Sequence, residues 1–176
     1  MKILILVLLF VLSLPLLAQS GWIDANGKPL ADTESMRSDG DFAVQLVLTP
    51  DENQFRQTWN STKNAPILSS TNSVRLGSSL AAMFIFQGCA QDVAGACNVT
   101  SEFILESPDG TKTPAGDGPI SSAAPLRKDI LQLGKASLKI GFGANDPLGN
   151  YKVIANVKDK ISGRILNLTT GFKVTK

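Results

Sequence analysis

Two cysteines, Cys89 and Cys97, are the only thiols in this 176-residue chain, which contains no histidine. Without histidine, the Ser-His and Cys-His arrangements of nucleophilic catalysis are excluded. Two cysteines also fall short of the four nitrogen or sulfur ligands that a zinc site usually needs. In an oxidising compartment each cysteine is the other's only partner, so the sequence predicts a disulfide between Cys89 and Cys97.

Hydroxyl and carboxylate chemistry finds little support in the spacing of the residues. A Ser-Lys pair is conceivable, but the spacing Ser-x-x-Lys does not occur in the chain. Glu102 and Glu106 are four residues apart on one expected strand face, which is about 13 Å and too far for the acid pair of a glycoside hydrolase. An acid pair assembled by the fold from distant loops stays open, with Asp92, Asp117 and Asp146 as examples.

Calcium is the most reasonable metal for this chain, because loop aspartates and asparagines supply oxygen ligands. The candidates are Asp24, Asn26, Asp92, Asp109, Asp117, Asn145 and Asp146. None of them repeats the dense alternation of an EF-hand loop, and turns favour Asp and Asn for their own backbone hydrogen bonds. The sequence therefore assigns no catalytic residue, no metal ligand and no cofactor.

The N-terminal segment, residues 1–20, reads MKILILVLLFVLSLPLLAQS. One lysine, an apolar run, a proline and then small residues are typical of a secretory signal peptide. We expect its removal to leave residues 21–176 as one domain without a transmembrane anchor, periplasmic or extracellular. The alternative is an uncleaved anchor, since the apolar stretch is only a little shorter than the roughly 17 to 25 residues that span a bilayer.

The charge of the chain is nearly balanced, with 17 basic and 15 acidic residues. Removal of the N-terminal segment takes away one lysine and brings the two numbers closer. The basic residues are scattered, whereas a nucleic-acid-binding protein normally carries a basic stripe. The sequence therefore indicates a partner other than nucleic acid.

Apolar residues recur with a period of two, the pattern of half-buried strands. The expected strands cover residues 42–48, 80–86, 101–106, 136–142, 151–157 and 164–174, the last interrupted at Gly171. The run 80–86 is apolar on both faces, as in a strand between two packed layers. Phe55 and Trp59, spaced i and i+4, predict one short helical turn. Six or seven short strands without alternating helices favour a single antiparallel β-sandwich, with a barrel as the alternative.

The segments between the strands carry three further expectations. Because Cys89 and Cys97 lie between two expected strands, the disulfide should staple the long tip of an antiparallel hairpin. Residues 111–126 are rich in Gly, Pro, Ser and Ala and predict a surface loop. Residues 21–41 are polar and turn-rich and predict a loosely held N-terminal strand. Trp22 and Trp59 are expected to pack in the core or under a lid.

The stretch from Asp146 through Gly149 to Tyr151, just before a strand, resembles the tyrosine corner of immunoglobulin-like domains. In that family the tyrosine hydroxyl bonds back to the backbone at the corner, and Val153 stands where antibody domains carry their second cysteine. The wider layout is similar to small exported bacterial proteins of unassigned function with an immunoglobulin-like β-sandwich. The resemblance implies such a sandwich of about seven strands, and it carries no functional residue.

These observations predict a non-catalytic exported protein that binds another envelope protein or a surface polymer. Sandwiches with exposed edges commonly recruit partners by strand addition, so a sheet edge, the loop 111–126 or the disulfide-tipped hairpin is the expected contact. The alternative is a carbohydrate-active accessory or hydrolase with a carboxylate pair assembled from loops. That alternative predicts a concave pocket holding two carboxylates within reach of each other.

Overall fold

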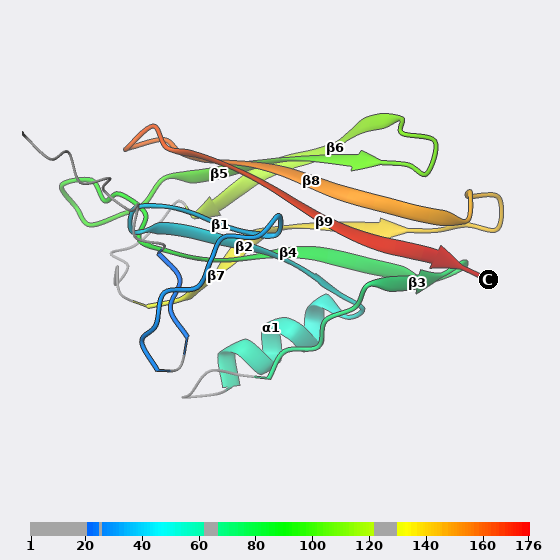
Figure 1. Ribbon diagram of the computed structural model, residues 1–176, viewed down its shortest axis with the longest axis horizontal. Coiled ribbons are helices and arrows are strands. Elements are labelled where there is room, and N and C mark those ends of the chain that lie inside the picture. The colour runs from blue at the N-terminus through cyan, green and yellow to red at the C-terminus, as the bar shows by residue number, and fades with distance from the viewer. Residues whose placement is uncertain (1–20, 25, 62–66, 122–129) are drawn as a thin grey trace, which may run out of the picture.

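The computed structural model describes residues 21–24, 26–61, 67–121 and 130–176, which form two β-sheets and one helix (Figure 1). The predicted signal peptide, residues 1–20, lies outside these ranges. The elements are β1 (Met36–Asp39), β2 (Phe42–Thr49), α1 (Glu52–Ser61), β3 (Ser73–Arg75), β4 (Ser79–Gln87), β5 (Val99–Glu106), β6 (Lys112–Ser121), β7 (Gln132–Gly141), β8 (Gly149–Asp159) and β9 (Ile165–Thr175). The ten-residue helix, the only one in the described ranges, is too short to cross a bilayer.

The strands pair as a four-stranded sheet in the order β1-β2-β4-β7 and a five-stranded sheet in the order β3-β9-β8-β5-β6. The expectation of a mostly β protein with two sheets is confirmed. Two details differ from it: the described chain has nine strands rather than about seven, and β3 pairs with β9 in parallel. The other strand pairs are antiparallel. The expected interruption of the last strand is also wrong, because β9 continues through Gly171.

The main core lies between the two sheets and follows the period-two pattern of the sequence. Alternate residues of β8, from Tyr151 to Val157, are buried, and so are apolar residues of β2 in the other sheet that belong to the same cluster. Phe84 of β4 and Phe103 of β5 stack at 5.1 Å between ring centroids and fill the centre. Because their rings join one sheet to the other, this aromatic contact fixes the spacing of the layers there.

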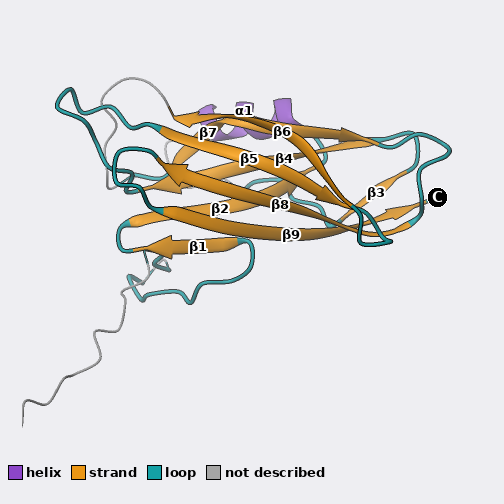
Figure 2. Ribbon diagram, turned by 90° about the horizontal axis from the view of Figure 1, so that it is seen from above, coloured by secondary structure: helices purple, strands orange, loops and turns teal. Residues whose placement is uncertain are grey.

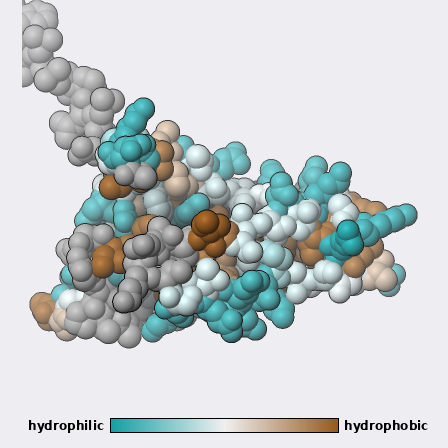
Figure 3. Space-filling model, turned by 90° about the horizontal axis from the view of Figure 1, so that it is seen from below, coloured by the Kyte–Doolittle hydropathy of each residue, from teal (hydrophilic) through white to brown (hydrophobic). Residues whose placement is uncertain are grey.

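A second apolar cluster covers the outer face of the four-stranded sheet. Ala81, Met83 and Ile85 of β4 point away from the main core and pack with Phe55 of α1 and with Trp22. The prediction that β4 lies between two packed layers is therefore correct. Trp22 is buried and its indole N–H donates to the Arg37 carbonyl oxygen, and Trp59 of α1 is half-buried. Seen from this side, the described surface is largely polar with small separated apolar groups (Figure 3).

Helix α1 begins after an aspartate cap and is tied to the edge strand β7. The Asp51 carboxylate accepts a hydrogen bond from the Gln54 N–H at 3.0 Å, which satisfies one of the free donors at the helix start. Glu52 accepts from the Ser137 hydroxyl at 2.7 Å and pairs with Arg56 at 2.9 Å. Arg56 in turn donates to the carbonyl oxygens of Gly134 and Lys135, where the pairing of β7 with β4 is irregular. The helix is longer than the single turn that the sequence predicted.

Residues 111–126 do not form the predicted loop where the structure describes them. Lys112–Ser121 is β6, which pairs with β5 at the edge of the five-stranded sheet. Pro114 and Pro119 are tolerated there because an edge strand does not need every N–H for pairing. The low β-propensity of this segment led to the wrong prediction of a loop, because pairing with β5 outweighs the local backbone preference of its residues. Residues 122–126 lie outside the described ranges.

The disulfide joins Cys89 to Cys97, with both residues buried. The expected hairpin around it is wrong, because β4 belongs to the four-stranded sheet and β5 to the five-stranded sheet. The bridge therefore closes the connection that carries the chain from one sheet to the other. The described part of residues 21–41 is also better held than expected, since β1 pairs with β2 and an isolated β-bridge joins Ile23 to Pro29.

We predict that Glu52→Gln lowers the free energy of unfolding by about 1 kcal/mol at neutral pH, because the carboxylate holds α1 on β7. Partial burial acts to raise the pKa of Glu52, but hydrogen bonds from Ser137 and Arg56 lower it below 4.5 overall. A lowered folded pKa stabilises the protein above the unfolded value and loses this effect as the pH falls through the folded value. Denaturant unfolding of wild type and variant between pH 7 and pH 3 should show the difference disappearing below pH 4.5. A difference that is constant over this range would contradict the assignment.

A second prediction concerns the disulfide. The double variant Cys89→Ser, Cys97→Ser should lose about 2.5 kcal/mol of stability, the loop-entropy value for a bridge of this length. Thermal unfolding measures the loss, and thiol labelling of the denatured, unreduced wild-type protein should find no free thiol. Two labelled thiols would show that the bridge does not form in the isolated protein.

Candidate functional site: the outer face of the five-stranded sheet

The two sheets differ in what covers their outer faces. Helix α1 and Trp22 pack on the four-stranded sheet, whereas no helix of the described chain packs on the five-stranded sheet. Figure 2 looks onto this second face and shows β5, β8 and β9 with α1 behind them. Its outward residues are polar at most positions, as the strand period requires of a face in contact with solvent. This face is therefore the one that the described helix leaves open to a ligand.

Four polar residues form one row across the open face. The strand register places Asp117 of β6 opposite Glu102 of β5, Glu102 opposite Asn156 of β8, and Asn156 opposite Asn167 of β9. Neighbouring strands are about 4.8 Å apart, so the row extends over roughly 14 Å at right angles to the strands. Two carboxylates followed by two amides present both hydrogen-bond acceptors and donors along one line.

The row crosses a shallow depression with a volume of about 640 Å³. Thr100 and Pro119 lie on one side of the row, with Lys158 and Ile165 in register with them on the next strands. Lys160 also lines the depression from the turn after β8. Its volume is within the range of small-molecule and side-chain binding pockets.

The charged groups of the depression are not paired with each other. Among the described residues no ion pair within 4.0 Å involves Glu102, Asp117, Lys158 or Lys160. Glu106, on the same strand and face as Glu102, lies between Lys112 at 3.5 Å and Lys152 at 3.3 Å. The hydrogen bond from Lys152, ahead of the other contributions, lowers the pKa of Glu106. The charge of Glu106 at one end of the face is thus neutralised by neighbouring lysines, whereas the charged residues of the depression at the other end have no such partner among the described residues.

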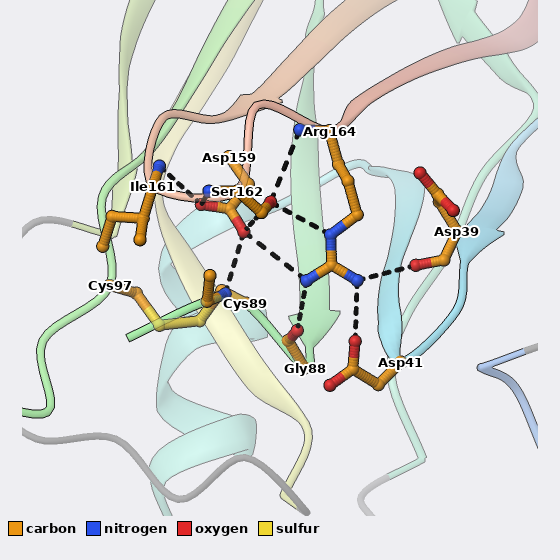
Figure 4. A network of polar contacts seen from close by, with 10 residues as sticks. Asp39, Asp41, Gly88, Cys89, Cys97, Asp159, Ile161, Ser162 and Arg164 are labelled. Atoms are coloured by element: carbon orange, nitrogen blue, oxygen red, sulfur yellow. Dashed lines mark hydrogen bonds and ion pairs between the residues drawn. A yellow bond between two sulfur atoms is a disulfide. The ribbon is translucent and has the colours of Figure 1, made fainter. Parts of the chain in front are cut away.

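One wall of the depression depends on a polar network at the end of the sandwich (Figure 4). Asp159, the last residue of β8, is fully buried and accepts hydrogen bonds from the Ala90 N–H at 2.8 Å and the Ser162 hydroxyl at 2.7 Å. Its carboxylate also lies 3.7 Å from a guanidinium nitrogen of Arg164. These contacts hold the turn between β8 and β9, which carries Lys160 and leads into Ile165.

Arg164 extends this network to the other sheet. Its guanidinium donates to the Asp39 carbonyl oxygen at 2.8 Å and the Gly88 carbonyl oxygen at 3.3 Å, and it pairs with the Asp41 carboxylate at 2.7 Å. It also lies 5.4 Å from the centre of the Phe42 ring. Gly88 is at a positive φ of 68° and so close to the Asp41 backbone that a side chain would collide with it. Glycine is therefore required where β4 ends beside this arginine.

The three loop carboxylates considered for an acid pair lie far apart. Asp92 lies in the disulfide loop after β4, where its carboxylate accepts from the N–H groups of Ala94 and Ala96. Asp146 follows β7 at the opposite end of the sandwich and accepts from the Gly143 N–H. Asp117 lies on the open sheet face. The structure brings none of the three together, and the carboxylate opposite Asp117 is Glu102 instead.

The residues of the tyrosine-corner motif lie together at the start of β8. The Tyr151 hydroxyl donates a hydrogen bond of 2.9 Å to the carbonyl oxygen of Pro147, four residues earlier. Asp146 and Gly149 lie on either side of this turn, and Gly149 is at a φ of 136° beside Pro108. Burial raises the pKa of Tyr151, and the negative charges of Asp146 and Asp109 add to the effect. The phenol therefore stays a neutral donor at physiological pH.

Two of the loop aspartates considered as calcium ligands accept hydrogen bonds from backbone N–H groups of their own turns. Asp24 accepts from the N–H groups of Asn26 and Lys28, and Asp109 accepts from Thr111. These hydrogen bonds lower the pKa of both carboxyls. In the described part of the chain no group of three or more His, Cys, Asp or Glu residues is arranged to hold a metal ion.

The juxtaposition of Glu102 and Asp117 was missed by the sequence reasoning. The run Ser107-Pro108-Asp109-Gly110 is a turn signal, and counting outward from it would place a partner strand in front of Glu102. One register shift, between Phe103 and Ile104, lies between this turn and Glu102 and moves the pairing away from a simple count. The turn therefore indicates a strand beside β5, but it does not identify Asp117 as the residue opposite Glu102.

Comparison with known proteins assigns no family. No family model matches the chain, and no curated protein matches it significantly. A family 123 glycoside hydrolase from Clostridium perfringens aligns with a TM-score of 0.42 and 12% identity over 76% of this chain, which spans 27% of that enzyme. A Niemann-Pick type C2 protein from the Japanese carpenter ant gives 0.38 and 10% over 74% of this chain and 89% of that one. An immunoglobulin-like protein from Pseudomonas aeruginosa gives 0.34 and 15% over 80% and 96%. These scores are too low to assign a fold family or an activity.

We predict that Asp159→Asn destabilises the protein by about 3 kcal/mol, because it removes one partner of a buried charge pair. Asp41→Asn is the matched control: it contacts the same arginine, but its side chain is 67% exposed, so its loss should cost less than about 1 kcal/mol. Denaturant unfolding of both variants measures the difference. Equal losses would show that the buried carboxylate is no more important than the exposed one.

Proposed function

We propose that this chain is a non-catalytic, exported binding or accessory protein with an immunoglobulin-like sandwich. It acts on another envelope protein or a surface polymer through the outer face of its five-stranded sheet. The observation that carries the proposal is the polar row from Asp117 to Asn167, which crosses an open depression on the one sheet face that no described helix covers.

The strand order supports the immunoglobulin-like part of the proposal. In that fold one sheet holds strands A, B, E and D, and the other runs G-F-C with an added strand C′ in variable-type domains. The orders β2-β4-β7 and β9-β8-β5-β6 match A-B-E and G-F-C-C′, with β8 as strand F and no described strand in the place of D. Tyr151, near the start of β8, then occupies the corner position, and the inter-sheet disulfide of antibody domains is replaced by apolar packing around Val153.

Two features support export. Residues 1–20 have the layout of a signal peptide. The disulfide between Cys89 and Cys97 is typical of proteins that mature in an oxidising compartment. Both are compatible with a periplasmic or extracellular protein.

The contact is proposed for the sheet face rather than for a sheet edge. Strand β6, an edge of the five-stranded sheet, carries Pro114 and Pro119, which lack the N–H groups that strand addition uses. Strand β1, an edge of the other sheet, is four residues long. Prolines in β6 and the short lengths of β1 and β3 protect three of the four edges from added strands. The fourth edge, β7, is partly covered, because Arg56 of α1 binds its Gly134 and Lys135 carbonyl oxygens. The side chains of the open face are therefore the better recognition surface.

A second candidate is a carbohydrate-active accessory or hydrolase that uses Glu102 and Asp117 as its acid pair. The observation in its favour is that these carboxylates lie directly opposite each other on neighbouring strands. Both are exposed on an open face, where little excludes water from a bound substrate. Hydrolysis of a glycan by wild type, lost in Glu102→Gln, would replace the binding proposal with this one.

The test compares variants of the full-length chain, expressed in its source and purified from the exported fraction. The double variant Asn156→Ala, Asn167→Ala should bind the captured envelope component at least about tenfold more weakly, because it removes several hydrogen-bonding groups worth about 1 kcal/mol each. Lys173→Ala, on β9 outside the depression, is the control and should bind like wild type. Crosslinked envelope extract is the source of ligand, and mass spectrometry together with sugar analysis identifies what is recovered.

Equal recovery by the double variant and the wild type would contradict the placement of the contact on this face. Absence of the protein from the exported fraction would contradict the proposal of export.

A further inference from the structure

The depression on the five-stranded sheet contains an unfavourable arrangement of charge that the rest of the face avoids. Glu102 and Asp117 lie directly opposite each other on antiparallel strands, a position in which like charges destabilise a sheet. Neither carboxylate has an ion-pair partner within 4.0 Å among the described residues.

Glu106 provides an internal comparison. It lies four residues further along β5, on the same face, opposite Lys112 on one neighbouring strand and Lys152 on the other. Both lysines pair with it. The sheet can therefore neutralise an outward glutamate through its cross-strand neighbours, and it does so for Glu106 but not for Glu102.

The depression also contains two positive charges, which lie away from the carboxylate pair. Lys158 of β8 and Lys160 of the following turn line it beside Ile165. The depression is therefore acidic on the β5 and β6 side and basic toward the turn that Asp159 and Arg164 hold. A complementary ligand presents a cation to the first region and an anion to the second.

We propose that the depression binds a polypeptide segment of an exported partner, with a lysine or arginine side chain of that segment lying between Glu102 and Asp117. This inference rests on the proposed function and specifies its partner. An acidic group of the same segment lies against Lys158 and Lys160. Arginine and lysine form their strongest hydrogen bonds with carboxylates, and a guanidinium can bind two carboxylate oxygens at once.

A polypeptide fits this surface better than a glycan does. The residues that line the depression include no aromatic side chain against which a sugar ring could pack. A polypeptide readily carries both signs of charge a few residues apart. It can also place an apolar side chain of its own against Ile165. The test must therefore distinguish a polypeptide from a polysaccharide that carries amino and carboxylate groups.

The experiment places a photo-crosslinking amino acid at Thr100, which lines the depression, in the full-length chain expressed in its source. A second protein carries the same group at Lys173, outside the depression. Each is combined with Glu102→Gln plus Asp117→Asn, or with the matched control Glu106→Gln on the same strand. We expect a protein crosslink at Thr100 that falls at least about tenfold in the Glu102, Asp117 variant and changes less than about twofold in Glu106→Gln.

The crosslinked peptide must contain a lysine or arginine near the attachment point. Charge exchange then provides the decisive result: Glu102→Lys should abolish the crosslink, and reversal of that basic residue in the partner to glutamate should restore it. The variant lacking both carboxylates should melt at the same temperature as wild type or higher, since it removes repulsion, so a lost crosslink will not reflect unfolding.

Three other outcomes are informative. A protein crosslink that is insensitive to Glu102 and Asp117 overturns the charge pairing and leaves the proposed function in place. A crosslinked polysaccharide overturns the polypeptide partner and also leaves the proposed function in place. No crosslink at Thr100, with a partner captured from another face of the protein, overturns both.

Discussion

The structure depends on a buried carboxylate and on the polar partners that surround it. Asp159 is fully buried, and a desolvated carboxylate is costly unless hydrogen bonds and an opposite charge surround it. The protein supplies the N–H of Ala90, the hydroxyl of Ser162 and the guanidinium of Arg164. Because Arg164 also contacts the ends of β1 and β4, satisfying this one group joins both sheets at the same end of the sandwich. The disulfide closes the segment between β4 and β5, which contains Ala90. The turn that bears Lys160 is therefore held by contacts with both sheets.

The sequence predicted those parts of the fold in which burial alternates along the chain. The period-two runs located β2, β4, β5, β7, β8 and β9, because one face of each packs in the core between the sheets. The two-sided apolar character of β4 also gave the correct inference of layers on both faces. The pattern failed for β6, whose residues have low strand propensity and gain their structure from pairing with β5. It failed again for the disulfide loop, since two strands that follow each other in sequence can pair or can cross to another sheet, and local periodicity does not distinguish these cases.

The candidate site was less predictable than the fold, for a related reason. Asn156 and Asn167 face outward by simple alternation in β8 and β9, and their pairing follows from the hairpin between them. The position of Asp117 opposite Glu102 depends on β6 being a strand and on an irregularity in its register with β5, between Phe103 and Ile104. A one-residue change of register would turn Asp117 to the other face. Polar residues on a sheet can thus be assigned to a face from sequence, while their neighbours across strands require the tertiary structure.

The two outer faces of the sandwich differ in how their outward residues are accommodated. On the four-stranded sheet the outward residues are apolar, and α1 buries them through Phe55 while Glu52 and Arg56 fix the helix to β7. On the five-stranded sheet the outward charges around Glu106 neutralise one another, which stabilises the sheet without any partner. On the described part of this face, the register also places the carboxylates of Glu102 and Asp117 directly opposite each other, an arrangement that destabilises a sheet. Departures of this kind from local optimisation are expected where a surface is selected for binding rather than for folding, because a partner's charge, when present, turns the repulsion into attraction.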